Sequence, residues 1–451
     1  MKRLFIPIIA GLLIMLCSCS DDDYLNAIPQ GSMALISIDM PKVAQENGSN
    51  TGILKDILHV DDVEKCGIDI KSKLYLFESP DGDLGLCARI SDRGDAEEWM
   101  RNLAKEGLAK SPKQQRGCLF TAIKSSWVVG ISESAMLVMG PAVGAAQAQM
   151  QQYMSRLLNL DEDQGIKGTP IYNKLDSINS PVAIVAQAQA LPEKFVAPFT
   201  LGAPKDADAS QVLIAADMEV KSGCLVINGE TFSFNKEINK ALHNAAKIYR
   251  PIRGKYTESM SKNALMGMFM NVDGNQFIKL LQTNRGLQAL LTGINAAIDM
   301  NNIIKSVNGD MAIVLPSFSD DALSISMAAQ LSNKNWLADV DYWKQSCPKG
   351  GRIENWGKDS YYYTDGSTSF YFGVTADNQF LSGDSRTSAE ASIKPSPAPI
   401  GKNIQQQING KRMCMVLNLN ALSKNKNEVS AVTSMLKPLF GNINAIVYSI
   451  K

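Results

Sequence analysis

The chain has 451 residues, of which 45% are hydrophobic, and its 45 basic and 45 acidic side chains give a formal charge of zero. Lys and Arg are dispersed among Asp and Glu, whereas nucleic-acid binding requires a basic face, so we expect no nucleic-acid partner. A chain of this length and apolar content can bury a large core, which excludes disorder for most of it.

The N-terminus has the form of a processed export signal. The basic pair Lys2-Arg3 precedes an apolar run over residues 4–16, shorter than the roughly 20 residues that span a bilayer. The run ends in Leu16-Cys17-Ser18-Cys19, which resembles the bacterial lipobox. The resemblance implies removal of residues 1–18 and lipidation of Cys19 by acyl chains such as palmitate. Each buried methylene adds about 0.8 kcal/mol, so two or three chains would anchor the protein in a membrane without a transmembrane helix.

An acidic stretch follows, formed by Ser20, Asp21, Asp22 and Asp23. It resembles the tether of Bacteroidetes lipoproteins that are exported to the outer face of the outer membrane. We therefore expect residues 19–30 to form a lipidated tether on a protein that is anchored in the outer membrane and faces the cell exterior. An ordinary secretory signal with a solvated linker is the alternative.

The first half begins with a β-like run at residues 33–40 and a hairpin around the turn Pro80-Asp81-Gly82-Asp83. Asp95 and Glu98 fit a helix start, and the apolar stripe of that helix falls on Ala96, Trp99, Met100 and Leu103. Three short strands, a helix and a fourth strand are predicted from Cys118, Trp127, Met136, Pro141 and Val182, respectively. Between Leu213 and Phe234 a last hairpin is expected, for which Ser222-Gly223 and Asn228-Gly229 are both turn signals.

The second half repeats this order of elements. Runs that begin at Ala264, Asp310 and Ala322 correspond to the first strand and hairpin, and Trp336, Val340 and Trp343 correspond to the Trp99 helix. Three strands from Ser360, Ser369 and Gln379 and a final run from Arg412 complete the correspondence. A period near 200 residues is too long for a solenoid and indicates duplication of a whole domain.

Three segments carry a resemblance to a Bacteroidetes lipoprotein family of unknown function, DUF4836, in addition to the lipobox and its acidic tether. They are YLNAIPQGSMALISID from Tyr24, NALMGMFMNVDGNQFIKLL from Asn263 and VNGDMAIVL from Val307. The resemblance covers essentially the whole mature chain. It implies an address and an architecture, and it assigns no chemistry.

Cysteine and histidine limit the chemistry available. With Cys17 removed and Cys19 lipidated, six thiols remain, at Cys66, Cys87, Cys118, Cys224, Cys347 and Cys414. Their spacing excludes a zinc knuckle, a haem attachment and a thioredoxin pair, and leaves disulfides open. Four of them, Cys87, Cys118, Cys224 and Cys414, lie in strand-like runs and are expected to be small buried hydrophobes. The only histidines, His59 and His243, are far apart, although histidine is the commonest general base and metal ligand.

Other motifs are weak. The acidic clusters at residues 81–83, 161–163 and 320–321 lack EF-hand spacing, so we interpret them as solvated turns and expect no metal. Gly383-Asp384-Ser385 faintly resembles a hydrolase nucleophile block, but no histidine follows it. We found no P-loop or dinucleotide fingerprint, so no cofactor is expected.

Two surface features remain as candidate sites. Trp99, Trp336 and Trp343 lie on apolar helix stripes and are expected in the core, whereas Trp356, Tyr361, Tyr362 and Tyr363 are candidates for an exposed aromatic patch. Asp176-Ser177-Ile178 resembles the acceptor motif of Bacteroides O-glycosylation, which makes Ser177 a candidate glycosylation site.

These observations predict an α+β fold of two related domains, residues 31–250 and 255–451, each with a mostly antiparallel sheet covered by amphipathic helices. The expected function is that of a non-catalytic surface lipoprotein that engages the membrane through its lipid and acts in binding or envelope interaction, with a glycan or a protein as candidate ligand. A structural spacer without a soluble ligand is a further possibility. The alternative is a hydrolase of glycans that uses carboxylates alone, with an Asp/Glu pair gathered from distant positions.

Overall fold

A computed structural model describes residues 22–47, 55, 59–60, 62–123, 126–161, 164–191, 200–282, 297–316, 318–319, 322–366, 368–423 and 440–450. The chain divides into two compact units: unit 1 is Met1–Ala44 with Ser49–Ser177, and unit 2 is Gln45–Gly48 with Ile178–Lys451. Among the helices in these ranges, none is long and apolar enough to cross a membrane. The predicted signal peptide, Cys19, Ser20 and Asp21 lie outside the described residues.

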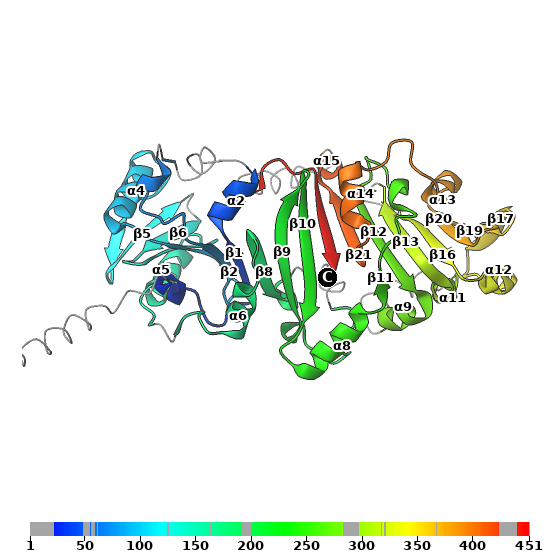
Figure 1. Cartoon of the computed structure of the whole chain (residues 1–451), viewed down its shortest axis with the longest axis horizontal. Helices are drawn as coiled ribbons and strands as arrows, with labels where there is room; N and C mark the ends of the chain where they lie inside the picture. Colours follow the sequence, from blue (N-terminus) through cyan, green and yellow to red (C-terminus); the bar gives the residue numbers. More distant parts are fainter. Residues whose placement is uncertain are drawn as a thin grey trace, which may run out of the picture. The chain divides into compact units, whose positions relative to one another are not determined.

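Unit 1 is built on an antiparallel sheet (Figure 1). Its strands, in sheet order, are β1 (Ala34–Ile38), β2 (Leu74–Glu78), β3 (Leu84–Arg89), β7 (Ala135–Gly140), β6 (Trp127–Ile131), β5 (Cys118–Ile123) and β4 (Lys113–Gln115). Its helices are α4 (Arg93–Lys105), α5 (Ala146–Leu157) and α6 (Pro170–Asp176), and α2 (Met40–Asn47) follows β1. The β2–β3 hairpin closes at the turn predicted from residues 80–83.

The apolar stripe that the sequence predicts for helix α4 is buried in the core of unit 1. This stripe of Ala96, Trp99, Met100 and Leu103 packs against β3, β5, β6 and β7. Each fully buried large apolar side chain contributes about 1.5–3 kcal/mol. The helix begins earlier than predicted, because Asp92 has an extended backbone and its side chain accepts a hydrogen bond from Asp95 N.

The predicted tether ends sooner than residue 30. A 3-10 helix, η1 (Asp23–Ala27), buries Tyr24 and Leu25 to 3% and 1% exposure. Tyr24 Oη donates a hydrogen bond to Lys73 O at 2.9 Å, and Cys87 Sγ donates to Tyr24 O at 3.2 Å. Residues 24–29 therefore belong to the body of unit 1, and among the described residues only Asp22 and Asp23 precede them.

Unit 2 has a long sheet in which the β10–β22 pair is parallel and the other pairs are antiparallel. The strands, in sheet order, are β8 (Val182–Gln187), β9 (Leu213–Lys221), β10 (Cys224–Phe232), β22 (Ala445–Ile450), β21 (Met413–Asn418), β12 (Met266–Asp273), β13 (Val307–Leu315), β16 (Ser326–Leu331), β20 (Gln379–Gly383), β19 (Ser369–Val374), β18 (Ser360–Thr364) and β17 (Arg352–Gly357). A short β11 (Tyr249–Arg250) pairs with the end of β12, and β14 (Phe318–Ser319) pairs with β15 (Ala322–Leu323).

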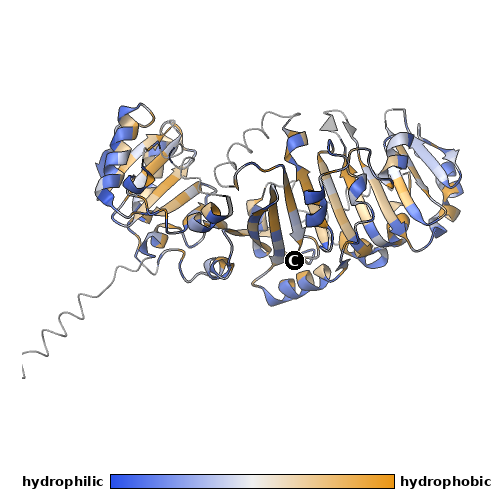
Figure 2. Ribbon diagram, turned by 45° about the horizontal axis from the view of Figure 1, so that its top comes forward, coloured by the Kyte–Doolittle hydropathy of each residue, from blue (hydrophilic) through white to orange (hydrophobic). Residues whose placement is uncertain are grey.

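Helices cover both faces of the unit 2 sheet, whose strands are coloured mainly as hydrophobic in Figure 2. They are α8 (Lys236–Ala246), α9 (Gly274–Leu281), α11 (Met300–Lys305), α12 (Val340–Gln345), α13 (Arg386–Ser392), α14 (Lys402–Ile408) and α15 (Leu419–Leu422). The α9 face carries a core that includes Met270, Phe277 and Trp336. On the opposite face, called the α14 face here, Ile404 and Ile408 pack in a second core with Cys414 and Val447.

The division between the units differs from the predicted boundary near residue 250. Strand β10 runs parallel to β22, with Cys224 opposite Ala445 and Gly229 opposite Ile450. This pairing ties the β9–β10 hairpin into the sheet of unit 2, so the compact units separate at Ser177 and Ile178. Sequence reasoning could not see this pairing, because its partners are more than 200 residues apart.

One predicted turn is wrong. The β9–β10 hairpin turns at Ser222 and Gly223, whose φ angles are 52° and 75°. Asn228 and Gly229 lie inside β10, where a Cβ on Gly229 would stand 2.6 Å from the ring of Tyr448. The glycine at this position therefore permits close packing of a neighbouring strand.

Candidate functional site

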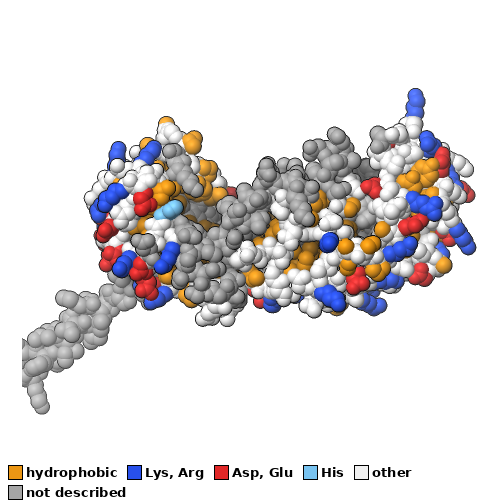
Figure 3. Space-filling view, turned by 90° about the horizontal axis from the view of Figure 1, so that it is seen from above, with side chains coloured by type: hydrophobic (Ala, Val, Ile, Leu, Met, Phe, Trp, Pro, Cys, Tyr) orange, Lys and Arg blue, Asp and Glu red, His pale blue; other side chains and the backbone are white. Residues whose placement is uncertain are grey.

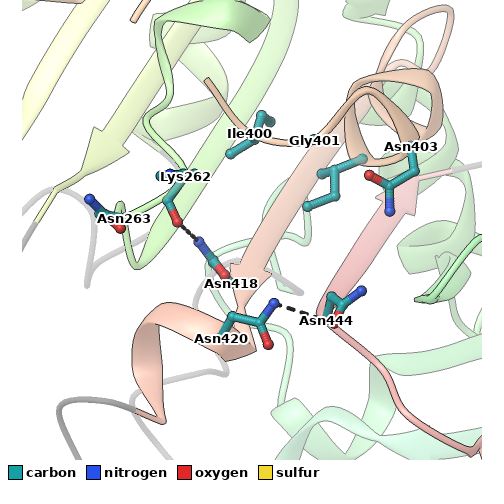
Figure 4. Close-up of a pocket in the computed structure, with 9 residues that line it drawn as sticks. Lys262, Asn263, Ile400, Gly401, Asn403, Asn418, Asn420 and Asn444 are labelled. Carbon is teal, nitrogen blue, oxygen red and sulfur yellow. Dashed lines mark hydrogen bonds between the residues drawn. The ribbon is translucent and has the colours of Figure 1, made fainter. Parts of the chain in front are cut away.

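A cavity of about 360 Å³ opens on the α14 face of unit 2, and asparagines predominate in its wall (Figure 4). We call it the amide cavity. Ile400 and Ile404 are buried at its base, and the exposed groups around them come from four separate segments of chain. It is lined by Lys262, Asn263, Ile400, Gly401, Asn403, Ile404, Asn418, Asn420 and Asn444.

Asn418 builds the wall of the amide cavity. It is 5% exposed, and its Nδ2 donates to Lys262 O at 2.8 Å and to Ala264 O at 2.9 Å. Its Oδ1 accepts from Ala421 N at 3.2 Å and so caps α15. Both amide protons and the amide oxygen of Asn418 are hydrogen-bonded within the protein, so Asn418 holds β21, α15 and the segment before β12 together.

Asn420 and Asn444 form the rim on the other side. Asn420 Nδ2 donates to Asn444 Oδ1 at 3.3 Å, and the backbone of Asn444 bonds Gly223 O and Leu419 N at 2.8 and 3.0 Å. Asn420 Oδ1 and Asn444 Nδ2 have no hydrogen-bond partner among the described residues. One free acceptor and one free donor therefore lie side by side at the rim.

Asn403 and the segment before β12 supply the remaining polar groups. Asn403 Nδ2 donates to Ser222 O at 2.8 Å, which leaves its Oδ1 free. Gly401 is required next to it, since a Cβ there would lie 2.4 Å from that oxygen. The side-chain amide of Asn263 and the ammonium of Lys262 are exposed, and neither makes a hydrogen bond or ion pair with the rest of the described chain.

The amide cavity is suited to a neutral, hydroxyl-rich ligand. A carboxamide offers a donor and an acceptor about 2 Å apart, which matches a pair of neighbouring hydroxyls that each donate and accept. An apolar base with a few convergent polar groups is the usual construction of a small-molecule site. The chemistry available here is recognition by hydrogen bonding.

A second cavity, of about 380 Å³, also opens on the α14 face of unit 2. We call it the charged cavity. It is lined by Asp217, Glu219, Lys221, Asn228, Gly410, Lys411, Arg412, Ser449 and Ile450. Charged groups of both signs thus face one hollow. On the face shown in Figure 3, acidic and basic side chains are likewise interspersed over the described surface of each unit.

The predicted aromatic patch is divided between the two faces of β18, because successive strand residues alternate. Tyr361 and Tyr363 pack against the core of the α9 face. On the opposite face, Tyr362 stacks on Tyr371 with ring centroids 5.0 Å apart and planes 14° apart. Trp356 donates from Nε1 to Tyr361 O at 2.8 Å, and the Arg386 guanidinium lies 5.2 Å from its ring centroid. The four predicted side chains are half-buried and lie on two faces of the sheet, so they form no single exposed patch.

The other predicted residues are placed as follows. Ser177 is exposed at the end of α6, and its Oγ donates to Lys174 O at 2.7 Å, so its glycosylation stays a prediction. Ser385, in the suspected nucleophile block, caps α13 by accepting from Ser388 N at 3.2 Å. Asp23 begins η1. No cluster that could hold a metal occurs in the described parts of the chain.

The cysteines follow the prediction from sequence. Cys87, Cys118, Cys224 and Cys414 are buried in β3, β5, β10 and β21, and all six described cysteines are free thiols. Burial raises the pKa of the Cys414 thiol to about 12, and it also raises the pKa of the Cys87 thiol. These groups therefore behave as buried hydrophobes.

Comparison with known proteins identifies one family model. Described as a domain of unknown function, DUF4836, it matches residues 31–431. Two structures, of crystal forms IV and III of TP0453, are 14% and 13% identical in sequence, each with a TM-score of 0.30. They cover 48% and 50% of this chain and 85% and 86% of their own, and likeness this weak carries no argument. None of the curated proteins matches the sequence.

Proposed function

The chain belongs to the DUF4836 family, whose description assigns no activity, and we propose that it is a non-catalytic lipoprotein that binds a neutral glycan in the amide cavity. Cys19 anchors it in the outer membrane, and the body faces the cell exterior. A Bacteroidetes origin, which the acidic tether suggests, is part of the same proposal.

The observation that carries the binding function is the set of unpaired amide groups. Asn403 Oδ1, Asn420 Oδ1 and Asn444 Nδ2 are free within the described structure and border one cavity (Figure 4). The buried Asn418 caps α15, which carries Asn420, and ties it to the segment before β12. Recognition groups on a fixed wall lose little conformational entropy when a ligand binds.

The proposed anchor is short. Asp22, the first described residue, is three positions after Cys19, and an extended chain spans at most about 3.6 Å per residue. A lipid on Cys19 would thus hold Asp22, the residue before η1, within about 11 Å of the modified residue. Cys19→Ala should release the protein from membranes, and changing Asp21, Asp22 and Asp23 to Asn should reduce surface labelling of intact cells. Unchanged fractionation or labelling would contradict the corresponding step.

We also propose that the two units descend from one duplicated domain. The sheet order β1-β2-β3-β7-β6-β5-β4 of unit 1 matches β12-β13-β16-β20-β19-β18-β17 of unit 2, strand for strand in chain order. In each set an Asp ends or follows the first strand and caps the next helix: Asp39 accepts from Lys42 N and Asp273 from Gln276 N, both at 3.2 Å. A shared order with a shared cap supports common descent, despite weak sequence identity.

A panel of neutral oligosaccharides tests the binding function. The mature chain should bind at least one member saturably, and Asn444→Ala should weaken that binding about tenfold, because a hydrogen bond lost without compensation costs about 1–3 kcal/mol. Asn442→Ala is the matched control, since Asn442 is exposed nearby and lies outside the lining. Absence of binding across the panel, or equal loss in both variants, would refute the assignment.

The carboxylate hydrolase remains a second candidate because of one observation. Asp217 and Glu219 both line the charged cavity from alternate positions of β9. However, Lys221 pairs with Glu219, and Asn228 Nδ2 donates to Asp217 Oδ2 at 2.9 Å. Both carboxylates are thus engaged by neighbouring side chains, whereas the catalytic pair of a glycosidase must face the scissile bond of its substrate. Hydrolysis of a glycan by the wild type, abolished in Glu219→Gln, would establish this alternative.

A further inference from the structure

The charged cavity is organised around one row of polar side chains that crosses three strands. Asn228 on β10 stands opposite Asp217 on β9 and opposite Ser449 on β22. Residues paired in this way point to the same face of a sheet. The row therefore forms a continuous polar floor on the α14 face.

Hydrogen bonds fix this floor. Asn228 Nδ2 donates to Asp217 Oδ2 at 2.9 Å, and Asn228 Oδ1 accepts from Ser449 Oγ at 2.9 Å and from Lys411 Nζ at 3.2 Å. Ser449 is 1% exposed, so the centre of the row is anchored in the protein interior. The carboxamide of Asn228 thus lies between the ammonium group of Lys411 and the carboxylate group of Asp217.

The sheet order places opposite charges on opposite walls. Asp217 and Glu219 come from β9, and Lys411 and Arg412 come from the residues just before β21, with β10 and β22 between them. Lys221 is engaged by Glu219. Arg412 is exposed and has no hydrogen bond or ion pair with the rest of the described chain, so its guanidinium is open to a ligand carboxylate.

We propose that the charged cavity binds a free α-amino acid as a zwitterion, a function that goes beyond glycan binding in the amide cavity. The ligand's ammonium group donates to Asp217 and Glu219, and its carboxylate accepts from Lys411 and Arg412. In an α-amino acid the ammonium and the carboxylate are attached to the same carbon. In the cavity, the Asn228 side chain alone lies between the Asp217 carboxylate and the Lys411 ammonium, so the two charges of the ligand can reach both groups. Complementary charges on fixed groups give such a site its selectivity.

A pool of the twenty common free amino acids is first screened for binding to the mature chain. Calorimetric titration with the individual amino acids then tests this proposal. At least one should bind saturably, and the N-acetyl and the α-amide derivatives of that amino acid should each bind at least about tenfold more weakly, since each lacks one charge. Absence of saturable binding, or equal binding of either derivative, would overturn it.

Variants locate the site. Arg412→Gln and Asp217→Asn should each weaken amino-acid binding about tenfold, whereas Lys402→Gln, an exposed lysine on α14 outside both cavities, should leave it unchanged. Arg412 is exposed, so its replacement leaves the fold intact. Loss of amino-acid binding in Asn444→Ala, with normal binding in Arg412→Gln, would place the ligand in the amide cavity and refute the assignment.

Discussion

The amide cavity and the charged cavity lie on the same face of one sheet, at the two ends of β21 and β22, and they differ in chemistry. The first is bordered by Asn418 and Asn444, the second by Lys411 and Ser449. Helix α14 runs between them, with Gly401 and Asn403 at one cavity and Gly410 at the other. The same two strands thus present neutral amides at one end and opposite charges at the other.

The position of each cavity in the sheet sets its chemistry. At the Asn444 end, β21 ends and β22 begins, so Asn418 caps α15 there and Asn420 and Asn444 lie outside the strands with part of each amide unbonded in the described chain. At the Ser449 end, three strands continue side by side, so their side chains form a row on one face. In each cavity a bonded polar group, Asn418 or Ser449, is nearly buried and holds the wall.

Replacement of Asn418, the buried amide in the wall of the amide cavity, should change the stability of the protein most. Asn418→Ala removes hydrogen bonds to two carbonyls and one N–H group, and it should lower the free energy of unfolding by about 3 kcal/mol. Urea denaturation followed by circular dichroism measures this loss. A change as small as that of the exposed Asn420→Ala would show that the wall does not depend on this amide.

The next effect concerns Cys414, which lies on the α14 face between the cavities and is covered by α14. Burial raises the pKa of its thiol to about 12 from 9.0. The folded state then holds a proton that the unfolded state releases, so this stabilisation is full below pH 9.0 and is lost as the pH rises toward about 12.

Each pH unit in that window should cost about 1.4 kcal/mol through this thiol. In Cys414→Ala the free energy of unfolding should therefore fall less steeply as the pH rises above 9.0, by about 1.4 kcal/mol for each pH unit. The control is Val416→Ala, because Val416 is buried on the same strand and face and has no ionisable group. A slope equal to wild type in Cys414→Ala would contradict the burial of this thiol.

A smaller effect is expected in the floor of the charged cavity. Ser449→Ala removes one hydrogen bond to Asn228 and should destabilise the protein by about 1 kcal/mol. The nearest match in the amide cavity is Asn444→Ala, whose side chain is exposed and should cost less than about 0.5 kcal/mol. Thermal unfolding compares the two, and a reversed order would mean that the floor of the charged cavity is not fixed.

The smallest effect is that of salt on ligand binding. Raising NaCl from about 0.05 M to about 0.5 M should weaken amino-acid binding several-fold, because ions screen exposed charges such as Arg412. Glycan binding in the amide cavity should change little, since the asparagines there are neutral. Equal salt dependence in both titrations would contradict the proposed chemical difference between the cavities.

Local features of the fold followed from sequence. Turn chemistry predicts the turn at residues 80–83, helical spacing predicts the buried stripe of α4, and apolar strand-like runs predict the four buried cysteines. Each depends on residues that are close in the chain, where periodicity and turn chemistry determine the structure. An α+β fold with a mainly antiparallel sheet was likewise predictable from the series of short strands and amphipathic helices.

Long-range features were missed. The parallel pairing of β10 with β22 moved the boundary between units away from residue 250, and contacts of Tyr24 with Lys73 and Cys87 shortened the tether. The amide cavity was also missed, because its asparagines come from segments between Lys262 and Asn444 that only tertiary structure brings together. The recurrence of Asn at strand ends, as in Asn418-Leu419-Asn420, was the one local signal for it.

A crossed titration tests whether two separate sites of different chemistry share the α14 face. A neutral saccharide and a free amino acid are each titrated into Asn444→Ala and Arg412→Gln, with the wild type as reference. We predict that Asn444→Ala loses about tenfold affinity for the saccharide alone, and Arg412→Gln about tenfold for the amino acid alone. One variant that weakens both ligands while the other weakens neither would contradict the account.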